Sequence, residues 1–378
     1  MDFPAPGEHV AAIAPSLIRT MAAYRTADTL DLGLGEPDLP LPQDLLENAF
    51  AQMKAGPMGY TPNAGLPELR QAIAAHLGLT ETKAWERIIV TCGSAGALSS
   101  TMGALVSPGD VILTPDPSYP AYADLIRMFH GENRRVALGE GGQDFVQRLT
   151  DASCEKTKGL IINTPVNPTG QVLSRETLLR TKEWAQTNGV WVISDEVYRT
   201  LYTGHAAPSL VDVYDDAFVV GGLSKSISMT GFRLGWVLAP ESCVNAICQV
   251  HRLTVTCAPR LSQLLALTVL KSPDQLKEPA QIYWQRRQKI RDVCQTMGFT
   301  NIQPEGAFYL WIDVSNFTDN TLSFCQRLHE ATSVLAIPGE AFGPAGQGFV
   351  RLSYATDLNL FLEGLQRIDD YVKTEKQP

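Results

Sequence analysis

A lysine with unusual neighbours is the first candidate for chemistry in this sequence. Lys225 follows the apolar segment 217–222, which the pattern predicts to be a buried strand. Small hydroxyl residues surround this lysine, and burial lowers the pKa of a lysine because desolvation disfavours the charged amine. An amine with a lowered pKa can attack a carbonyl carbon and form a Schiff base. Eight residues later, Arg233 supplies a permanent positive charge that suits a phosphate.

A carboxylate at the end of a buried strand is the second candidate. Asp195 ends the segment 190–195, which is rich in β-branched residues. An unpaired carboxylate there is costly, so Asp195 needs a cationic partner. A protonated pyridine nitrogen is such a partner, and this pairing keeps the ring positive so that it accepts electrons.

Two further segments suit a planar aromatic ligand. The run 163–170, N-T-P-V-N-P-T-G, follows an apolar strand, and its Asn167 offers an amide to a phenolate-type oxygen. Tyr198 is expected to donate to the same oxygen. Tyr119 lies among closely spaced prolines that restrict the backbone, so its ring can stack on a heteroaromatic ring. Tyr122, three residues further on, is predicted to be structural.

Two segments have the features of anion sites. A predicted strand at 88–92 turns through glycines into a helix, and such a turn exposes unpaired amides at the helix N-terminus. The hydroxyl of Ser94 and the amide of Ala95 are therefore candidates for binding a phosphate. Arg351 lies inside the apolar strand 349–355, where its planar guanidinium needs an anion and matches a carboxylate.

Each of these segments also has an ordinary structural explanation. Lys225 and Arg233 could lie in a surface loop, and Asp195 could cap the helix that follows it. Arg351 could belong to an internal salt bridge. Tyr60, which opens a loop before a predicted helix at 66–76, could simply pack over that loop. The order of the segments along the chain helps to decide between these alternatives.

Taken together, the segments resemble the class I/II aminotransferases, enzymes of fold type I that use pyridoxal phosphate. The run S-K-x-x-x-M-T-G-x-R-x-G at 224–235 is similar to the cofactor-lysine motif of that family. The other segments follow in the family's order, from Gly35 to Arg351. The resemblance implies that Lys225 forms a Schiff base with the cofactor and later moves a proton as general base and acid. It also implies ping-pong transfer of an amino group from an α-amino acid to a 2-oxo acid.

The resemblance assigns an expected role to each site residue. The catalytic residues would be Lys225, Asp195 and Tyr198. The substrate carboxylate would be bound by Arg351, Asn167 and the Gly35 backbone. Tyr60 would cross to a neighbouring subunit and contact its cofactor phosphate, which implies a homodimer. The expected cofactor-binding residues are Tyr60, Ser94, Ala95, Tyr119, Asn167, Asp195, Tyr198, Ser224, Lys225 and Arg233.

The sequence departs from the family pattern near the lysine, where Gly222 stands at a position often occupied by serine or threonine. One hydroxyl contact to the phosphate is therefore expected to be absent. Arg252 and Arg260 fall in a region where some relatives bring a substrate-recognising arginine from the other subunit. Neither arginine can be aligned from the sequence alone, and a surface or interface position is the simpler expectation for both.

Three other functions share most of these residues. A C–S lyase or an aminocyclopropane-carboxylate-synthase-like enzyme has the same fold, although some lyases carry histidine where this chain has Val166. A cofactor-sensing regulator is disfavoured because the N-terminal segment is short and the chain is acidic. A catalytically inactive scaffold is disfavoured because Lys225, Asp195 and Arg351 are all present.

Composition and order predict an α/β protein with two domains. The 378 residues are 44% hydrophobic, which is enough for a large core. A large cofactor-binding domain is expected at 36–270, with a mostly parallel seven-stranded sheet between helices. A smaller α+β domain is expected to combine 1–35 with 271–378. Residues 10–24 are predicted to be helical.

Charge and cysteine content narrow the expected binding partners and cellular location. The formal net charge is −9, so the basic footprint of a nucleic-acid-binding protein is absent. No apolar run is long enough to span a bilayer, and residues 1–4 do not begin a signal pattern. Seven cysteines without a C-x-x-C pair favour free thiols over disulfides or a metal site. A soluble cytoplasmic protein is expected.

Overall fold

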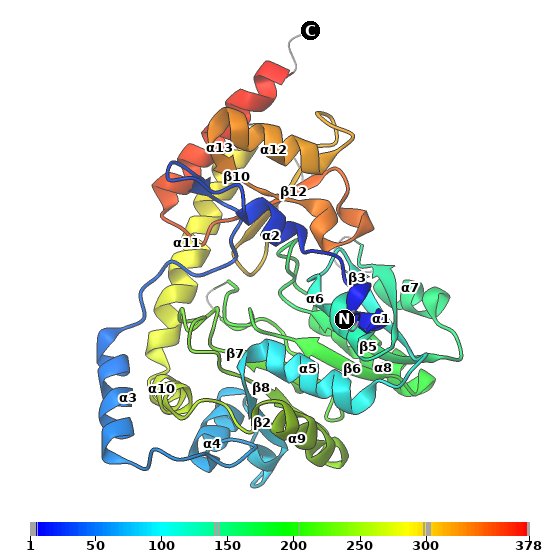
Figure 1. Cartoon of the computed structure of the whole chain (residues 1–378), viewed down its shortest axis with the longest axis vertical. Helices are drawn as coiled ribbons and strands as arrows, with labels where there is room; N and C mark the ends of the chain where they lie inside the picture. Colours follow the sequence, from blue (N-terminus) through cyan, green and yellow to red (C-terminus); the bar gives the residue numbers. More distant parts are fainter. Residues whose placement is uncertain are drawn as a thin grey trace.

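The two larger sheets of the described residues organise the chain, one in the lower part and one in the upper part of the view in Figure 1. The computed structural model describes residues 5, 7–139, 142, 144–203, 205–297, 299 and 304–375. Residues 1–4, for which the sequence predicts no signal pattern, lie outside the described residues. The long helix α11 (Asp274–Met297) runs from beside α10 (Arg260–Leu270) up to the upper part.

The lower sheet has seven strands in the order β2-β8-β7-β6-β5-β3-β4. Strand β8 is antiparallel to both of its neighbours, and the other pairs are parallel. The predicted α/β fold with a mostly parallel seven-stranded sheet is therefore confirmed. The strands are β2 (Ile88–Thr91), β8 (Gly235–Leu238), β7 (Phe218–Gly222), β6 (Trp191–Asp195), β5 (Thr157–Asn163), β3 (Val111–Asp116) and β4 (Glu132–Ala137).

Helices cover both faces of this sheet because successive strand residues point to opposite sides. Ile161 and Ile193 belong to one core with α5 (Gly93–Leu105), α6 (Ala121–Met128) and α9 (Glu241–Val255). Ile162 and Val192 belong to the core on the other face. The helices on that second face are α3 (Gln43–Ala55), α4 (Pro67–His76), α7 (Phe145–Ala152), α8 (Arg175–Asn188) and α10.

The upper part has its own core, drawn mainly from residues before 33 and after 279. An antiparallel sheet has the order β11-β12-β9, and β1 pairs in parallel with β10. The elements are β1 (Leu30–Asp31), β9 (Tyr309–Asp313), β10 (Val334–Leu335), β11 (Ile337–Pro338), β12 (Phe349–Ser353), α12 (Thr321–Thr332) and α13 (Leu358–Glu375). Short 3₁₀ helices are η1 (Ala84–Arg87), η3 (Leu210–Asp212), η4 (Gly339–Phe342) and η5 (Pro344–Gly346).

The predicted continuous helix at 10–24 is wrong. The structure has two short helices, α1 (Glu8–Ala11) and α2 (Leu17–Ala22), with a break between them. Pro15 lies in the break, where its ring and missing N–H disfavour helix for itself and for the residue before it. Arg127 of α6 donates to the backbone oxygen of Ala12, 2.6 Å away. The N-terminal segment therefore starts on the lower part and reaches the upper part at α2 (Figure 1).

No helix in the described ranges combines the length and apolar character needed to cross a bilayer.

Candidate active site

The carboxyl edge of the lower sheet gathers the predicted residues. Asn163 ends β5 and is in register with Asp195 at the end of β6, and Asp195 is in register with Val220 of β7. Lys225 lies in the turn that follows β7. Neighbouring parallel strands thus deliver an amide, a carboxylate and an amine to one edge, which is where open α/β sheets bind ligands.

Asp195 is a buried carboxylate with few partners. Its side chain is 4% exposed, and its Oδ2 accepts a hydrogen bond from the Tyr122 hydroxyl at 2.7 Å. The other oxygen has only a long contact of 3.4 Å from the backbone N–H of Val197. Burial raises the pKa of Asp195 from 3.8 to about 6, and the Tyr122 hydrogen bond and the charge of Lys225 oppose that rise. A cation beside this carboxylate would lower its pKa back toward the ordinary value.

Tyr122 was predicted to be only structural, and that prediction is incomplete. The residue is fully buried on α6, with its ring edge-to-face against Tyr119 at 5.5 Å, and its hydroxyl donates to Asp195. Asp195 lies 73 residues further along the chain, so sequence spacing could not reveal the pair. The sequence offered one indirect signal, because a buried aspartate needs a hydrogen-bond donor from some part of the chain.

Lys225 is the amine of the site. Its Nζ donates to the backbone oxygen of Gly35 at 2.7 Å. Its pKa is lowered from 10.5 to about 8, mainly by burial and in part by the charges of Arg351 and Arg233, while Glu36 and Asp195 act in the opposite direction. The predicted lowering of the lysine pKa therefore has its cause in the structure, and the neutral amine is accessible near neutral pH.

Residues 33–39, here called the crossing segment, attach the lysine turn to the rest of the site. Besides the Lys225 contact, the Ser228 hydroxyl donates to the backbone oxygen of Leu39 at 2.5 Å. The Thr230 hydroxyl donates to Glu36 at 2.5 Å. Glycine is required at position 35 because a Cβ there would lie 2.2 Å from the Tyr309 hydroxyl.

The same crossing segment is bound to the upper part. Arg286 of α11 holds both carboxylate oxygens of Asp38 at 2.7 and 2.8 Å, and Tyr283 donates to the same carboxylate at 3.0 Å. Arg351 of β12 donates to the backbone oxygen of Gly33 at 2.6 Å. The crossing segment therefore touches both the amine and the guanidinium of the site.

Arg351 is buried without a carboxylate partner. The side chain is 2% exposed, and no ion pair joins it to an acidic group among the described residues. Its guanidinium lies between the rings of Tyr309 and Phe342, 4.4 and 4.7 Å from their centroids. Its Nε has no hydrogen-bond partner within the part of the chain that the structure describes. An internal salt bridge therefore does not account for Arg351, and an anion would complete its hydrogen bonding.

Asn167 is held in place from the end of β5. The side-chain oxygen of Asn163 accepts a hydrogen bond from the Asn167 N–H at 2.7 Å, and the Asn163 amide donates to the backbone oxygen of Asp195 at 2.8 Å. The Asn167 oxygen accepts from Arg351 at 2.9 Å. Asn167 therefore contacts the arginine directly and keeps its NH₂ group to donate to a ligand.

A pair of tyrosines completes the wall of the site. The hydroxyls of Tyr198 and Tyr309 are 2.7 Å apart, and both side chains are buried. Burial raises the pKa of both phenols, so both are protonated and can donate. The sequence indicated Tyr198 as a site residue but not Tyr309, which comes from β9 in the upper part. The one sequence signal for Tyr309 was a polar hydroxyl in an otherwise apolar strand.

The N-terminus of α5 and Arg233 form a positive corner. A Cβ at Gly93 would lie 2.6 Å from the Arg233 Nη2, and a Cβ at Gly235 would lie 2.4 Å from the backbone nitrogen of Ser94. Arg233 thus approaches the first turn of α5, and its Nη1 donates to the backbone oxygen of Thr230 at 2.8 Å. Unpaired helix amides next to a guanidinium suit a phosphate group. Ser94 and Ala95 lie in this turn.

The remaining candidates differ in how close they come to this edge. Tyr119 is partly buried, and the charges of Asp195 and Arg351 influence its pKa, which burial raises. Ser224 directly precedes Lys225, and Gly222 ends β7 without a hydroxyl. Tyr60 is different: its side chain is 84% exposed on the loop before α4, so this single chain does not enclose it.

Among the described residues, no group of three or more His, Cys, Asp or Glu side chains could hold a metal ion.

Comparisons with known proteins agree over almost the whole chain. Residues 27–368 match the family model described as aminotransferase class I and II. A probable aspartate aminotransferase of Methanocaldococcus jannaschii is 32% identical over 91% of this chain and 93% of its own length. The aspartate aminotransferase of Thermotoga maritima is 33% identical over 92% of each chain.

Solved structures give the same result. An aminotransferase from Mycobacterium tuberculosis superposes with a TM-score of 0.91 at 29% identity, covering 98% of this chain and 100% of the other. The aspartate aminotransferase of Thermus thermophilus with maleate has a TM-score of 0.91 at 29% identity, covering 97% and 100%.

Proposed function

Because the chain belongs to the class I and II aminotransferases, we propose individual roles for the residues that meet at the edge of its sheet. The family uses pyridoxal phosphate and transfers an amino group from an amino acid to a 2-oxo acid, and this chain is such an enzyme. The roles below rest on the geometry of Asp195, Lys225, Arg233 and Arg351.

The residues fit the cofactor on three independent points. Asp195 is a buried carboxylate whose raised pKa marks the lack of a cation, and a pyridinium nitrogen supplies one. The first turn of α5 and Arg233 suit the phosphate. Asn167 and Tyr198 provide donors for a phenolic oxygen. When bound, pyridoxal phosphate supplies an electron sink for a carbanion at the substrate Cα.

We assign the proton transfer to Lys225. Its Nζ has a pKa of about 8, compared with 10.5 for an ordinary lysine, so far more of the amine is neutral and able to accept a proton near neutral pH than in an exposed lysine. In this role the Lys225 Nζ would remove the proton from the substrate Cα and deliver a proton to the cofactor carbon that is joined to the transferred nitrogen. Asp195 acts by keeping the ring nitrogen protonated, and Tyr198 and Asn167 act by donating to the ring oxygen.

We assign the substrate carboxylate to Arg351. The free Nε of its buried guanidinium and its contacts with Asn167 and the Gly33 carbonyl fix a position for one planar anion. The rings of Tyr309 and Phe342 hold the guanidinium plane. An α-carboxylate bound there brings the rest of the amino acid toward Lys225.

The observation that carries this proposal is the convergence of the Lys225, Asp195, Arg233 and Arg351 charges at one edge of the sheet. Its test is the absorption spectrum of the cofactor-loaded protein while single amino acids are added without an oxo acid. Bleaching of the visible band with release of one equivalent of oxo acid is expected. Continuous release of pyruvate and ammonia would instead identify a lyase. A protein that acquires no visible band with pyridoxal phosphate would contradict the assigned roles.

We also propose a homodimer with shared sites. Met58, Tyr60, Leu253 and Val255 are exposed apolar side chains. They lie close together because Asn63 donates to the Thr256 oxygen at 2.8 Å and Arg260 donates to the Gly59 oxygen at 3.1 Å. A second copy of the chain would cover this surface and receive Tyr60.

Subunit mixing tests the shared site. Tyr60→Ala and Lys225→Ala chains each lack one part of the site, so a mixed dimer would contain one site with both parts intact. The mixture is expected to regain activity that neither variant has alone. A monomer by light scattering, or no regain of activity after mixing, would contradict the shared site.

For the amino donor, we propose a dicarboxylic amino acid. Relatives at about one-third identity are named as aspartate aminotransferases, and Arg260 is fastened beside Tyr60. If Tyr60 reaches a neighbouring site, Arg260 accompanies it and can bind a second carboxylate. Aspartate is expected to have a higher kcat/KM than phenylalanine, and Arg260→Gln is expected to remove the difference. A preference for phenylalanine in the unmodified enzyme would reject this donor class.

Two further proposals concern organisation and location. The separate core of the upper part supports a small domain made of 1–35 and 271–378 beside a large domain at 36–270. The seven cysteines are free, which supports a reducing compartment such as the cytoplasm.

A further inference from the structure

A guanidinium from the lower sheet reaches across to the upper part of the molecule. Arg135 lies near the end of β4, and its Nη1 donates to the backbone oxygen of Phe342 at 3.1 Å. Phe342 ends η4 and belongs to the core of the upper part. The same oxygen accepts a second hydrogen bond, at 2.9 Å, from the backbone N–H of Ser118, which follows β3. The ends of two neighbouring strands of the lower sheet therefore hold one carbonyl of the upper part.

The turn after Phe342 lies directly against the same guanidinium. Asp116, the last residue of β3, has one oxygen 3.9 Å from the Arg135 Nη1, and its other oxygen accepts from the Ala345 N–H at 3.3 Å. Gly343 has a φ of +132°, and a Cβ there would collide with the Asp116 Oδ1 and lie 2.5 Å from the Arg135 Nη1. Glycine permits this close approach of the backbone to both charged groups.

The ring of Phe342 carries this connection to the substrate site. The side chain is fully buried, and its centroid lies 4.7 Å from the guanidinium carbon of Arg351. Trp311 packs edge-to-face against the same ring at 5.8 Å. Because side chains in a packed core have little room to move, the ring follows its own backbone. A displacement of the Phe342 carbonyl would therefore reach the guanidinium of Arg351.

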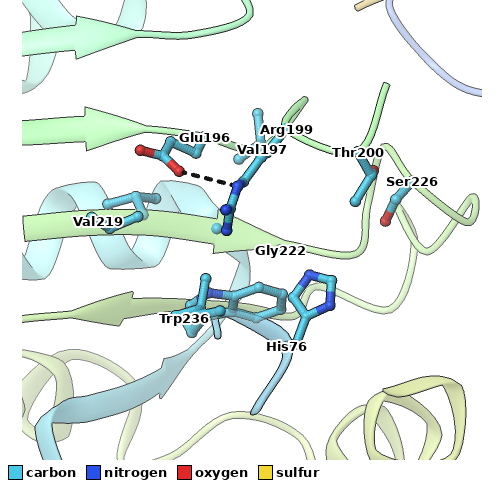
Figure 2. A pocket seen from close by; sticks show the side chains of 12 residues that line it. His76, Glu196, Val197, Arg199, Thr200, Val219, Gly222, Ser226 and Trp236 are labelled. Atoms are coloured by element: carbon cyan, nitrogen blue, oxygen red, sulfur yellow. Dashed lines mark ion pairs between the residues drawn. The ribbon is translucent and has the colours of Figure 1, made fainter. Parts of the chain in front are cut away.

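Arg199 shows the more common arrangement, in which a guanidinium binds groups from its own segment. It lies 4.0 Å from Glu196, three residues earlier, as the dashed line in Figure 2 marks. It also donates to the backbone oxygen of Ala207 at 3.3 Å. Both partners come from the segment between β6 and β7. Arg135 differs from Arg199 because it joins the two parts of the molecule next to a site residue.

The charge of Arg135 is balanced by its own neighbours. Burial raises the pKa of Asp116 and of Asp124, and the charge of Arg135 opposes the rise in both, together with Arg127 in the case of Asp124. Carboxylates this close to a guanidinium leave little net positive charge to act on a distant anion. Arg135 is therefore expected to act by contact and not through a long-range field.

We propose that Arg135 is a positioning residue for substrate binding: by holding the Phe342 carbonyl, it fixes the ring against which the Arg351 guanidinium lies. This inference rests on the proposed role of Arg351 as the partner of the substrate carboxylate. Ser118, the second donor to that carbonyl, directly precedes Tyr119, which is expected to stack on the cofactor ring. The arrangement thus joins the wall of the cofactor site to the arginine assigned to the substrate.

The first test compares two neighbouring arginines of β4. Arg135→Met keeps the aliphatic stem and removes the donor, so KM for the amino acid is expected to rise about tenfold with kcat nearly unchanged. Arg134→Met is the matched control, because Arg134 donates to the backbone oxygen of Ala152 at 2.8 Å within the lower part. The control is expected to keep KM. Equal KM values in the two variants would overturn the proposal, even if Arg135→Met unfolds at a lower temperature.

A double-mutant cycle tests whether Arg135 acts through the ring. Phe342→Leu removes the ring and keeps the backbone carbonyl, so on that background Arg135→Met is expected to change KM by less than about twofold. A tenfold rise in KM that persists on the Phe342→Leu background would overturn the proposal. If Arg135→Met does not fold, Arg135→Lys takes its place in the same cycle, because it keeps the charge and one donor but loses the planar fork. A smaller rise in KM is then expected, again confined to the background with Phe342.

Arg351→Lys separates this inference from the proposed function. A raised KM in Arg351→Lys beside an unchanged KM in Arg135→Met would reject the positioning role alone. An unchanged KM in Arg351→Lys would overturn both. The pH midpoint of the visible cofactor band is expected to stay the same in Arg135→Met, because Lys225 is held through the Gly35 carbonyl and not through Phe342. A shifted midpoint would indicate a general disturbance of the site and overturn a role specific to Arg351.

Discussion

Asp195, the last residue of β6, and Glu196, which directly follows the strand, are neighbouring buried carboxylates with different surroundings. Burial raises the pKa of both. Glu196 has every oxygen engaged by protein groups, including two hydroxyls, a backbone N–H and the guanidinium of Arg199. Asp195 has one short hydrogen bond, from Tyr122.

Two buried arginines repeat the contrast. Arg287 and Arg351 are both 2% exposed. Arg287 donates to the Tyr354 hydroxyl and to three backbone carbonyls, so its guanidinium is satisfied within the protein. Arg351 has two protein acceptors and a free Nε. A buried charge that the protein satisfies supports the fold, and a buried charge that it leaves incomplete prepares a place for a ligand.

The largest expected effect is the loss of activity when Lys225 is replaced, compared with a lysine whose ammonium already has a carboxylate partner. Lys225→Ala is expected to reduce turnover by about 10⁴-fold or more, because the proton acceptor is lost. Lys373, paired with Asp369 at 2.5 Å, is the control, and Lys373→Ala is expected to keep activity. Steady-state kinetics of both variants make the comparison. Undiminished transamination in Lys225→Ala would reject the role of the lysine.

The second largest effect on activity is expected from the adjacent carboxylates, Asp195 and Glu196. Asp195→Asn is expected to lower kcat by about 10³-fold, because the ring nitrogen loses its counter-charge, yet to stabilise the cofactor-free protein at pH 8. A pKa raised from 3.8 to about 6 corresponds to a folding cost of up to about 3 kcal/mol, which the neutral amide removes. Glu196→Gln places an NH₂ group against hydrogen-bond donors. It is therefore expected to lose about 1–3 kcal/mol of stability and to keep activity.

Kinetics and thermal unfolding of the cofactor-free variants at pH 8 measure both effects. A loss of stability in Asp195→Asn equal to that in Glu196→Gln would erase the distinction between the two carboxylates.

A smaller effect on activity is expected from the two buried arginines, Arg351 and Arg287. Arg351→Lys is expected to raise KM for the amino acid by about 10²-fold, because a point charge replaces a planar pair of donors. Arg287→Lys is expected to leave KM unchanged and lower the unfolding temperature. Substrate saturation curves beside thermal melts show whether each arginine affects binding or folding. A raised KM in Arg287→Lys would place that arginine in the site.

The smallest expected effect concerns Tyr122. Its hydrogen bond lowers the pKa of Asp195, so Tyr122→Phe is expected to raise that pKa further. In the cofactor-free protein the cost of the buried carboxylate is present in full above about pH 6 and is relieved as pH falls toward 3.8. Cofactor binding needs the ionised carboxylate, so its acid limb should move to higher pH.

Fluorescence titration of the cofactor-free protein with pyridoxal phosphate between pH 5 and 8 measures this shift. Tyr371→Phe is the control, since that buried hydroxyl has no partner among the described residues. The same acid limb in Tyr122→Phe and in the unmodified protein would show that this hydrogen bond does not tune Asp195.

The sequence alone predicts the sheet and most of the residues at its edge, since strand ends, glycine turns and buried charges are local features. Asp195 and Arg351 stand out because they lie in apolar strands, and Lys225 because it follows one. Tyr122 and Tyr309 do not, because their roles depend on contacts with segments far away in the chain. The break near Pro15 was missed because the apolar spacing continues across it.

The crossing segment has a practical consequence for redesign of this enzyme. Gly33 contacts the arginine assigned to the substrate carboxylate, and two residues later Gly35 contacts the lysine amine. Only Leu34 separates them, and its side chain is exposed. Substrate preference and amine basicity therefore share one short piece of backbone and cannot be tuned independently there. Libraries that alter residues 33–35 should be screened for both properties at once.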